Sequence, residues 1–157
     1  MNVNKKGTKK YIFFICFVLF DLPNLIKKKE MKKQLNHVKT FHDCFGIENK
    51  HTPTPIINQD VFLLRHRLMS EENEEYMEAC KNGDLVEIAD ALGDMMYILC
   101  GTILSHGLQD KIEEVFEEIQ KSNMSKLDAN NKPIYREDGK IMKGPNYFKP
   151  DIKSVMS

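Results

Sequence analysis

The sequence predicts an all-α protein: a helical bundle, completed by oligomerisation, with a short hairpin and an irregular tail at the carboxyl end. Apolar residues recur at helical spacing through several segments, and glycine or asparagine separates these segments from one another. The length of 157 residues suits one domain. A hydrophobic fraction of 41% and a charged fraction of 29% are ordinary for a globular protein, which argues against a disordered chain and a multi-pass membrane protein.

The first two helices follow from caps and periodicity. A helix is expected over residues 34–45 and should end at Gly46, with an apolar face made of Leu35, Val38, Phe41 and Phe45. A loop containing two prolines comes next. The second helix should begin after Asn58 or Asp60 as its cap and run to about Asn82.

The sequence of the carboxyl half predicts two more helices, followed by a segment without helical periodicity. A third helix over residues 85–106 is apolar over most of its circumference, so we expect it in the centre of a bundle. A fourth helix follows over residues 110–123. Residues 133–143 predict two short extended pieces around the turn sequence Asp138-Gly139, and an irregular tail follows.

The amino-terminal segment differs from everything after it. Residues 1–33 hold nine lysines and two acids, and the apolar run 11–20 is too short to span a bilayer comfortably. Export signal, native extension and an upstream stretch ahead of a start at Met31 all remain open, and we favour the last. We therefore assign residues 1–30 to an extension and residues 31–157 to the domain. Deletion up to Met31 is expected to leave folding, assembly and activity unchanged.

Charge and cysteine content restrict the partners and the compartment. With residues 1–33 set aside, the chain is acidic by seven charges, which argues against a nucleic-acid polymer as partner and suits a site that recruits cations. The four cysteines show no C-x-x-C spacing, which is typical of reduced thiols in a cytoplasmic protein. Association with a membrane is not expected.

Acidic residues interrupt the apolar face of the second helix. Val61, Leu64 and Leu68 form a stripe whose continuation at helical spacing falls on Glu72 and Glu75. Two carboxylates therefore point where the core should be. Glu71 flanks this line.

The third helix carries a matching acidic line. Glu87, Asp90 and Asp94 follow one another at spacings of three and four, and no lysine or arginine occurs between residues 85 and 106. Like charges at these spacings repel by ~0.2–0.5 kcal/mol per pair, so the line calls for a cation. Carboxylate oxygens without nearby cysteine or histidine favour Mg²⁺, with Mn²⁺ as a substitute. The alternative is that both lines are ordinary solvent-exposed helix faces.

The pattern Glu71-Glu72-x-x-Glu75, followed by Glu87-x-x-Asp90 and Leu92-Gly93-Asp94, resembles the signature of the all-alpha NTP pyrophosphatases. This superfamily includes MazG-type enzymes, dimeric dUTPases and phosphoribosyl-ATP pyrophosphohydrolase. The similarity covers roughly residues 31–152 and is most specific over residues 89–97. Residues 122–126 and 143–147 resemble the tail of a phosphoribosyl-ATP pyrophosphohydrolase-like subgroup.

The resemblance implies a nucleotide pyrophosphohydrolase that splits the α–β phosphate bond of a nucleoside triphosphate, giving a monophosphate and pyrophosphate. It also implies homodimers or tetramers whose helices interlock. Two alternatives stay open: phosphoribosyl-ATP hydrolysis in histidine biosynthesis, and a catalytically silent helical dimer that binds nucleotide or a protein partner.

The resemblance also implies roles for individual residues. This chain has Ala91 where MazG has glutamate, so the second acidic pair is either Glu87 with Asp90 or Asp90 with Asp94. The metal ligands are expected to be Glu72, Glu75, Asp90 and Asp94. Glu71 or Glu87 would act as the base. Substrate contacts are expected from Asn123, Lys126 and Lys143, and candidates for a base pocket are Phe41, His42 and Tyr97, the two aromatics being more typical of core packing.

Overall fold

The computed structural model describes residues 30–157, and the expectations for the amino-terminal extension lie outside this part. The fold is all-α, as predicted, and the four long helices lie within four residues of their predicted bounds. These helices are α2 (Glu30–Phe45), α3 (Gln59–Asn82), α4 (Leu85–Ser105) and α5 (Ile112–Met124). A short helix that the sequence analysis did not predict, α6 (Ile152–Met156), ends the chain.

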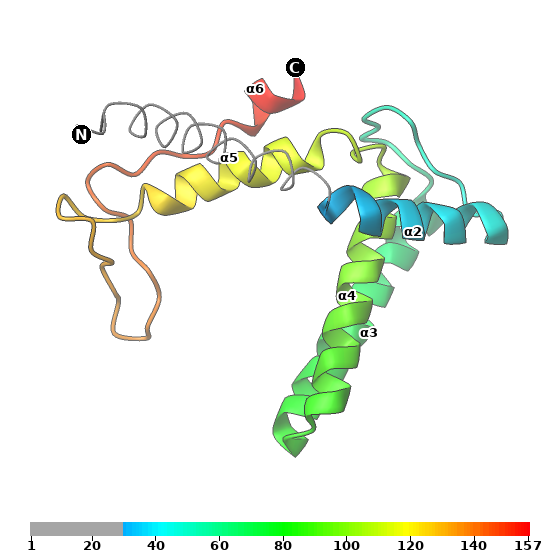
Figure 1. Ribbon diagram of the computed structural model, residues 1–157, viewed down its shortest axis with the longest axis horizontal. Helices are drawn as coiled ribbons and strands as arrows, with labels where there is room; N and C mark the ends of the chain where they lie inside the picture. Colours follow the sequence, from blue (N-terminus) through cyan, green and yellow to red (C-terminus); the bar gives the residue numbers. More distant parts are fainter. Residues whose placement is uncertain (1–29) are drawn as a thin grey trace, which may run out of the picture.

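Helices α3 and α4 form a long antiparallel hairpin (Figure 1). Asn58 caps α3 by accepting a hydrogen bond from the backbone N–H of Asp60 at 2.8 Å. Gly83 closes the hairpin with φ of +65°, a left-handed conformation that glycine adopts without steric cost. Asp84 then caps α4, because its carboxylate accepts from the backbone N–H groups of Val86 and Glu87 at 3.0 and 3.2 Å.

The core lies at the open end of this hairpin, where α2 crosses the last turns of α4. Its buried members are Leu35, Val38, Cys100, Ile103 and Leu104. The loop between α2 and α3 folds over the carboxyl end of α4, where the backbone N–H of Thr54 donates to the carbonyl of His106 at 2.9 Å. His106 Nδ1 also lies 3.0 Å from the carbonyl of Thr54, so the side chain and the carbonyl of this residue both hold the loop against the end of α4.

The amino-terminal half of α4 is exposed. Leu92, Met96 and Leu99 follow one another at helical spacing and are about half exposed, and Leu85 is 76% exposed. By length and hydropathy alone α4 could cross a membrane, a property that it shares with the central helices of soluble proteins. The chain by itself therefore does not place α4 in the centre of a bundle.

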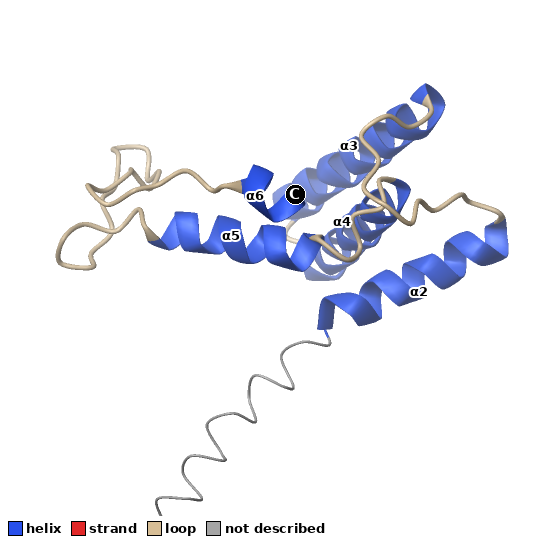
Figure 2. Cartoon of the chain, turned by 90° about the horizontal axis from the view of Figure 1, so that it is seen from above, coloured by secondary structure: helices blue, strands red, loops and turns tan. Residues whose placement is uncertain are grey.

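Helix α5 leads away from the hairpin, in the direction opposite to α2 (Figures 1 and 2). The tail folds back along α5: Ser122 Oγ donates to the carbonyl of Phe148 at 2.8 Å, and Lys111 Nζ donates to that of Val155 at 2.9 Å. The described residues contain no strand, and the expected hairpin has a single antiparallel bridge between Tyr135 and Ile141.

Candidate functional site

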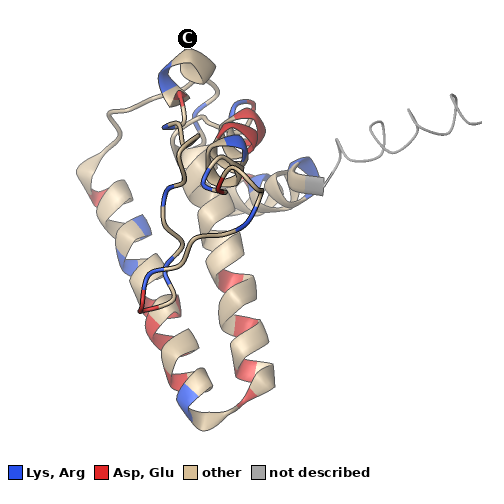
Figure 3. Cartoon of the chain, turned by 90° about the vertical axis from the view of Figure 1, so that its left-hand side faces the viewer, with Lys and Arg blue, Asp and Glu red and all other residues tan. Residues whose placement is uncertain are grey.

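The hairpin sets which residues of α3 and α4 face each other. Gly83 lies at its centre, so residues equally far from Gly83 along the two helices lie at the same level. Glu72 stands eleven residues before Gly83 and Asp94 eleven after, which puts their carboxylates at one level of the hairpin. Figure 3 shows Asp and Glu gathered along both arms near the closed end. The two acidic lines thus lie on neighbouring arms of the hairpin.

The Glu72 carboxyl has a raised pKa. Its side chain is half-buried, and burial is the main reason that its pKa lies above the ordinary value. The charges of Glu75, Asp94, Asp90 and Glu71, in decreasing order, raise the pKa further. Because four carboxylates from two helices repel the charge of Glu72, this residue marks the centre of the group. We call the group the acidic cluster and define it as Glu71, Glu72, Glu75, Asp90 and Asp94.

The other predicted acid is Glu87, which lies on α4 two turns closer to the hairpin turn than Asp94 and is not among the charges that act on Glu72. The remaining members of the acidic cluster are exposed. Within residues 30–157 no three Asp, Glu, His or Cys side chains converge closely enough to hold a single metal ion. The structure therefore brings the predicted acids to one surface without drawing them into a closed coordination shell.

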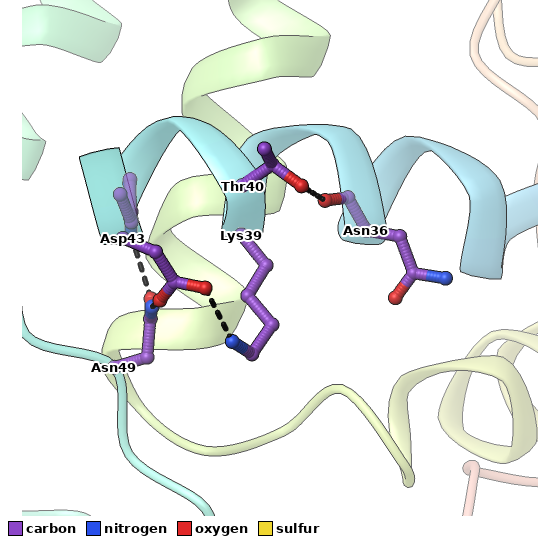
Figure 4. A network of polar contacts seen from close by, with 6 residues as sticks. Asn36, Lys39, Thr40, Asp43 and Asn49 are labelled. Atoms are coloured by element: carbon purple, nitrogen blue, oxygen red, sulfur yellow. Dashed lines mark hydrogen bonds and ion pairs between the residues drawn. The ribbon is translucent and has the colours of Figure 1, made fainter. Parts of the chain in front are cut away.

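A buried polar cluster lies beyond the acidic cluster, toward the open end. His42, only 1% exposed, has Asn49 Oδ1 2.6 Å from its Nδ1 and Arg65 Nη2 3.3 Å from its Nε2. Because a guanidinium only donates hydrogen bonds, Nε2 accepts from Arg65 and Nδ1 carries the hydrogen that is donated to Asn49. Asn49 in turn lies beside Asp43, whose carboxylate is paired with Lys39 at 2.6 Å (Figure 4).

His42 is thus buried between α2 and the α3–α4 hairpin. Sequence reasoning missed its contact with Arg65, because no local pattern connects side chains from two different helices. Gly101, a glycine within the apolar third helix, was the one sign in the sequence that another side chain packs closely against α4.

The burial of His42 predicts an acid-sensitive fold. Burial lowers the pKa of His42 and Arg65 lowers it further, whereas the hydrogen bond to Asn49 and the charge of Asp43 oppose the shift. Since the folded state holds this proton less tightly than the unfolded chain, whose pKa is 6.5, stability is complete above that value and falls as the pH drops through it. Urea unfolding between about pH 8 and pH 5 should show this loss in the wild type and a flatter profile in His42→Gln. His37→Gln, at an exposed position of α2, is the matched control, and equal profiles for all three proteins would contradict the prediction.

The three predicted substrate contacts lie elsewhere. Lys126 Nζ donates to Asn123 Oδ1 at 2.7 Å, just after α5, and Lys143 Nζ lies 4.3 Å from the centre of the Tyr147 ring. Figures 1 and 2 place this end of α5 and the tail well apart from the acidic half of the hairpin. Within one chain these residues and the acidic cluster do not form a common site.

The two aromatic candidates, Phe41 and Tyr97, meet edge to face with ring centres 5.8 Å apart. Each is about 40% exposed, so the expectation of core packing is wrong for this chain. They lie at the surface between α2 and α4.

Residues 38–123 match the family model described as phosphoribosyl-ATP pyrophosphohydrolase, or PRA-PH. The matched stretch contains the whole α3–α4 hairpin with every member of the acidic cluster, together with Arg65 and His42. The tail that carries Lys126 and Lys143 follows the matched residues. No curated protein matches the chain.

Proposed function

This chain belongs to the phosphoribosyl-ATP pyrophosphohydrolase family, within the all-alpha NTP pyrophosphatases, and we propose that its substrate is phosphoribosyl-ATP. The chain is a pyrophosphohydrolase that acts on a phosphoric anhydride bond. Cleavage between the α and β phosphates would give phosphoribosyl-AMP and pyrophosphate. The sequence pattern by itself favours a general nucleoside triphosphate over this substrate, whereas the family match favours phosphoribosyl-ATP. The match over the acidic hairpin is the observation that carries the proposal.

The acidic cluster fits a hard divalent cation by the chemistry of its donors. Its members offer only carboxylate oxygens, the ligands that Mg²⁺ prefers. The raised pKa of Glu72, caused by burial and by its acidic neighbours, marks a position where a cation would relieve repulsion. Glu72, Glu75, Asp90 and Asp94 would hold Mg²⁺, or Mn²⁺ in its place. When bound, the cation would neutralise phosphate charge and acidify water.

Apart from binding the cation, the protein has to position the attacking water and accept a proton from it. Glu71 or Glu87 would take the proton from the attacking water, because an ionised carboxylate within reach is a competent general base. Glu71 lies beside Glu72 and is 3.8 Å from Arg67 Nε, an exposed pair that orients the carboxylate more than it stabilises the fold. Pyrophosphate then leaves, with its charge stabilised by the groups that held it.

We also propose that the active form is a homodimer or tetramer. The exposed apolar side chains of α4 would be buried by a second copy, which would complete the bundle. The same assembly could bring Asn123, Lys126 and Lys143 of one copy to the acidic cluster of another. Three free cysteines in residues 30–157, Cys44, Cys80 and Cys100, support a cytoplasmic location.

A second candidate substrate is an ordinary nucleoside triphosphate. One observation favours it: residues 124–157 follow the matched stretch and form a structured tail hydrogen-bonded to α5. This tail carries six lysines, Lys126 and Lys143 among them, and in an assembly it would change the charge around the acidic cluster and thereby the nucleotide that is accepted.

The test is product identification with the full chain, Mg²⁺, and either phosphoribosyl-ATP or ATP, followed by phosphorus NMR. Pyrophosphate released from phosphoribosyl-ATP with the higher kcat/KM supports the proposal. Pyrophosphate from ATP at an equal or higher kcat/KM would replace it with the second candidate. No pyrophosphate from either nucleotide would contradict both and favour a silent nucleotide-binding protein.

A further inference from the structure

The half-buried Arg65 has no acidic partner in the part of the chain that the structure describes. Within residues 31–157 no carboxylate lies within ion-pair distance of its guanidinium, although the other two arginines, Arg67 and Arg136, each have one. Its Nε is buried and lacks any hydrogen-bond partner among the described residues. Burial of a guanidinium without a counter-ion is costly, and burial accordingly lowers the pKa of Arg65. A charge kept in this state is open to an anion from outside the described residues.

The neighbours of Arg65 hold it in place without neutralising it. His42 Nε2 accepts from Nη2 at 3.3 Å, and this imidazole is neutral, because burial and the adjacent guanidinium lower its pKa. Gly101 of α4 provides the space: a Cβ there would lie 2.9 Å from Arg65 Nη1 and 3.1 Å from His42 Nε2. Glycine inside a helix costs ~1 kcal/mol relative to alanine, so this position gives up helix stability where Arg65 lies against α4.

Arg65 also lies in line with the acidic cluster. It precedes Glu72 by seven residues, which is two helical turns, so both side chains lie on the same face of α3. The rise between them is about 10 Å. Arg65 is thus beyond reach of phosphates held directly by the cluster, but it is near enough to meet another group of the same extended substrate.

We propose that Arg65 binds a phosphate group of the substrate other than the scissile α–β pair, with His42 as the residue that positions the guanidinium. This inference rests on the proposed function. Two groups have the required chemistry, namely the 5-phosphate of the second ribose in phosphoribosyl-ATP and the γ-phosphate of either nucleotide. A planar guanidinium with free donors suits both.

The first experiment compares steady-state kinetics of wild type, Arg65→Gln and Arg65→Lys on the two nucleotides. We expect Arg65→Gln to raise KM by roughly 10- to 100-fold with a much smaller change in kcat, and Arg65→Lys to recover part of the loss. A rise with phosphoribosyl-ATP alone assigns the ribose phosphate, and a rise with both assigns the γ-phosphate. Arg136→Gln, a matched change in the tail, should leave both constants unchanged. Unchanged KM in Arg65→Gln for both nucleotides would overturn the proposal.

The second experiment needs no turnover, so it separates failure of this inference from failure of the proposed function. In EDTA, inorganic phosphate should raise the melting temperature of the wild type and of Arg136→Gln, but not that of Arg65→Gln. An equal rise in all three proteins, or none in the wild type, would overturn the assignment even if the enzyme releases pyrophosphate. A rise specific to Arg65 would support it even if neither nucleotide is hydrolysed.

Gly101→Ala displaces the guanidinium without removing its charge. Alanine favours the helix, but its Cβ would lie 2.9 Å from Arg65 Nη1 and 3.1 Å from Nε2 of the buried His42, so both side chains must shift. We expect a KM raised at least about threefold in the folded protein. An unchanged KM in a folded Gly101→Ala protein would contradict the role of Arg65.

Discussion

Asp94→Asn is expected to abolish pyrophosphate release, with kcat lowered by roughly 10³-fold, while the helical fold stays intact. The substitution removes a ligand charge at the level of Glu72 with almost no change in volume. Asp94 is exposed and forms no ion pair within the described residues, so the fold does not depend on it. Circular dichroism and a pyrophosphate assay with Mg²⁺ measure the two effects. Asp110→Asn, at an exposed position before α5, is the matched control and should keep full activity.

The same variant should be more stable than the wild type when metal is absent. Burial and then the charges of Glu75, Asp94 and Asp90 raise the pKa of Glu72, so an ionised Glu72 costs folding free energy as the pH rises above its ordinary value of 4.5. Loss of the Asp94 charge removes part of that cost. Full activity in Asp94→Asn, or a lower melting temperature in EDTA near neutral pH, would contradict the position assigned to Asp94.

The second large effect concerns assembly. The double variant Met96→Lys with Leu99→Lys is expected to turn a wild-type oligomer into a monomer and to abolish activity. Both side chains are about half exposed on α4, and two lysines in a symmetric apolar contact would be desolvated without partners. Light scattering at micromolar concentration gives the masses. Ile56→Lys changes an apolar side chain that is 87% exposed in the loop before α3, and it should keep the wild-type mass.

A wild-type protein that is already monomeric would contradict this prediction, as would a double variant with the wild-type mass and activity. A monomer that remains active would place the whole site within one chain. The lysines of the tail would then have no role in it.

The helices were predictable because their ends are determined locally. Asn58 and Asp84 cap α3 and α4 through side-chain contacts with the next few residues, and Gly83 provides the left-handed turn between them. The facing acidic lines were predictable for the same reason, since helical spacing and a tight turn fix which residues share a level of the hairpin.

The contact of His42 with Arg65 was not predictable in this way. It depends on how α2 crosses the hairpin, and that crossing follows from burial of Leu35 and Val38 against the end of α4. Helix α6 in the tail was also not predictable, because its five residues are too few to show a helical period in the sequence. The sequence predicts that the whole of α4 is buried in a core. In one chain it is mainly the carboxyl end that is buried, because no other helix in residues 30–157 covers the exposed apolar side chains of its amino-terminal half.

Binding of Mn²⁺ in place of Mg²⁺, followed by electron paramagnetic resonance, tests the acidic cluster most directly. The full chain is titrated with Mn²⁺, alone and with pyrophosphate, beside Glu72→Gln and the Asp110→Asn control. We predict that the wild type and the control remove free Mn²⁺ from solution with the same affinity, and that Glu72→Gln loses this binding by at least about tenfold. No bound Mn²⁺ in the wild type under either condition, or equal binding in Glu72→Gln, would contradict a metal site at this cluster.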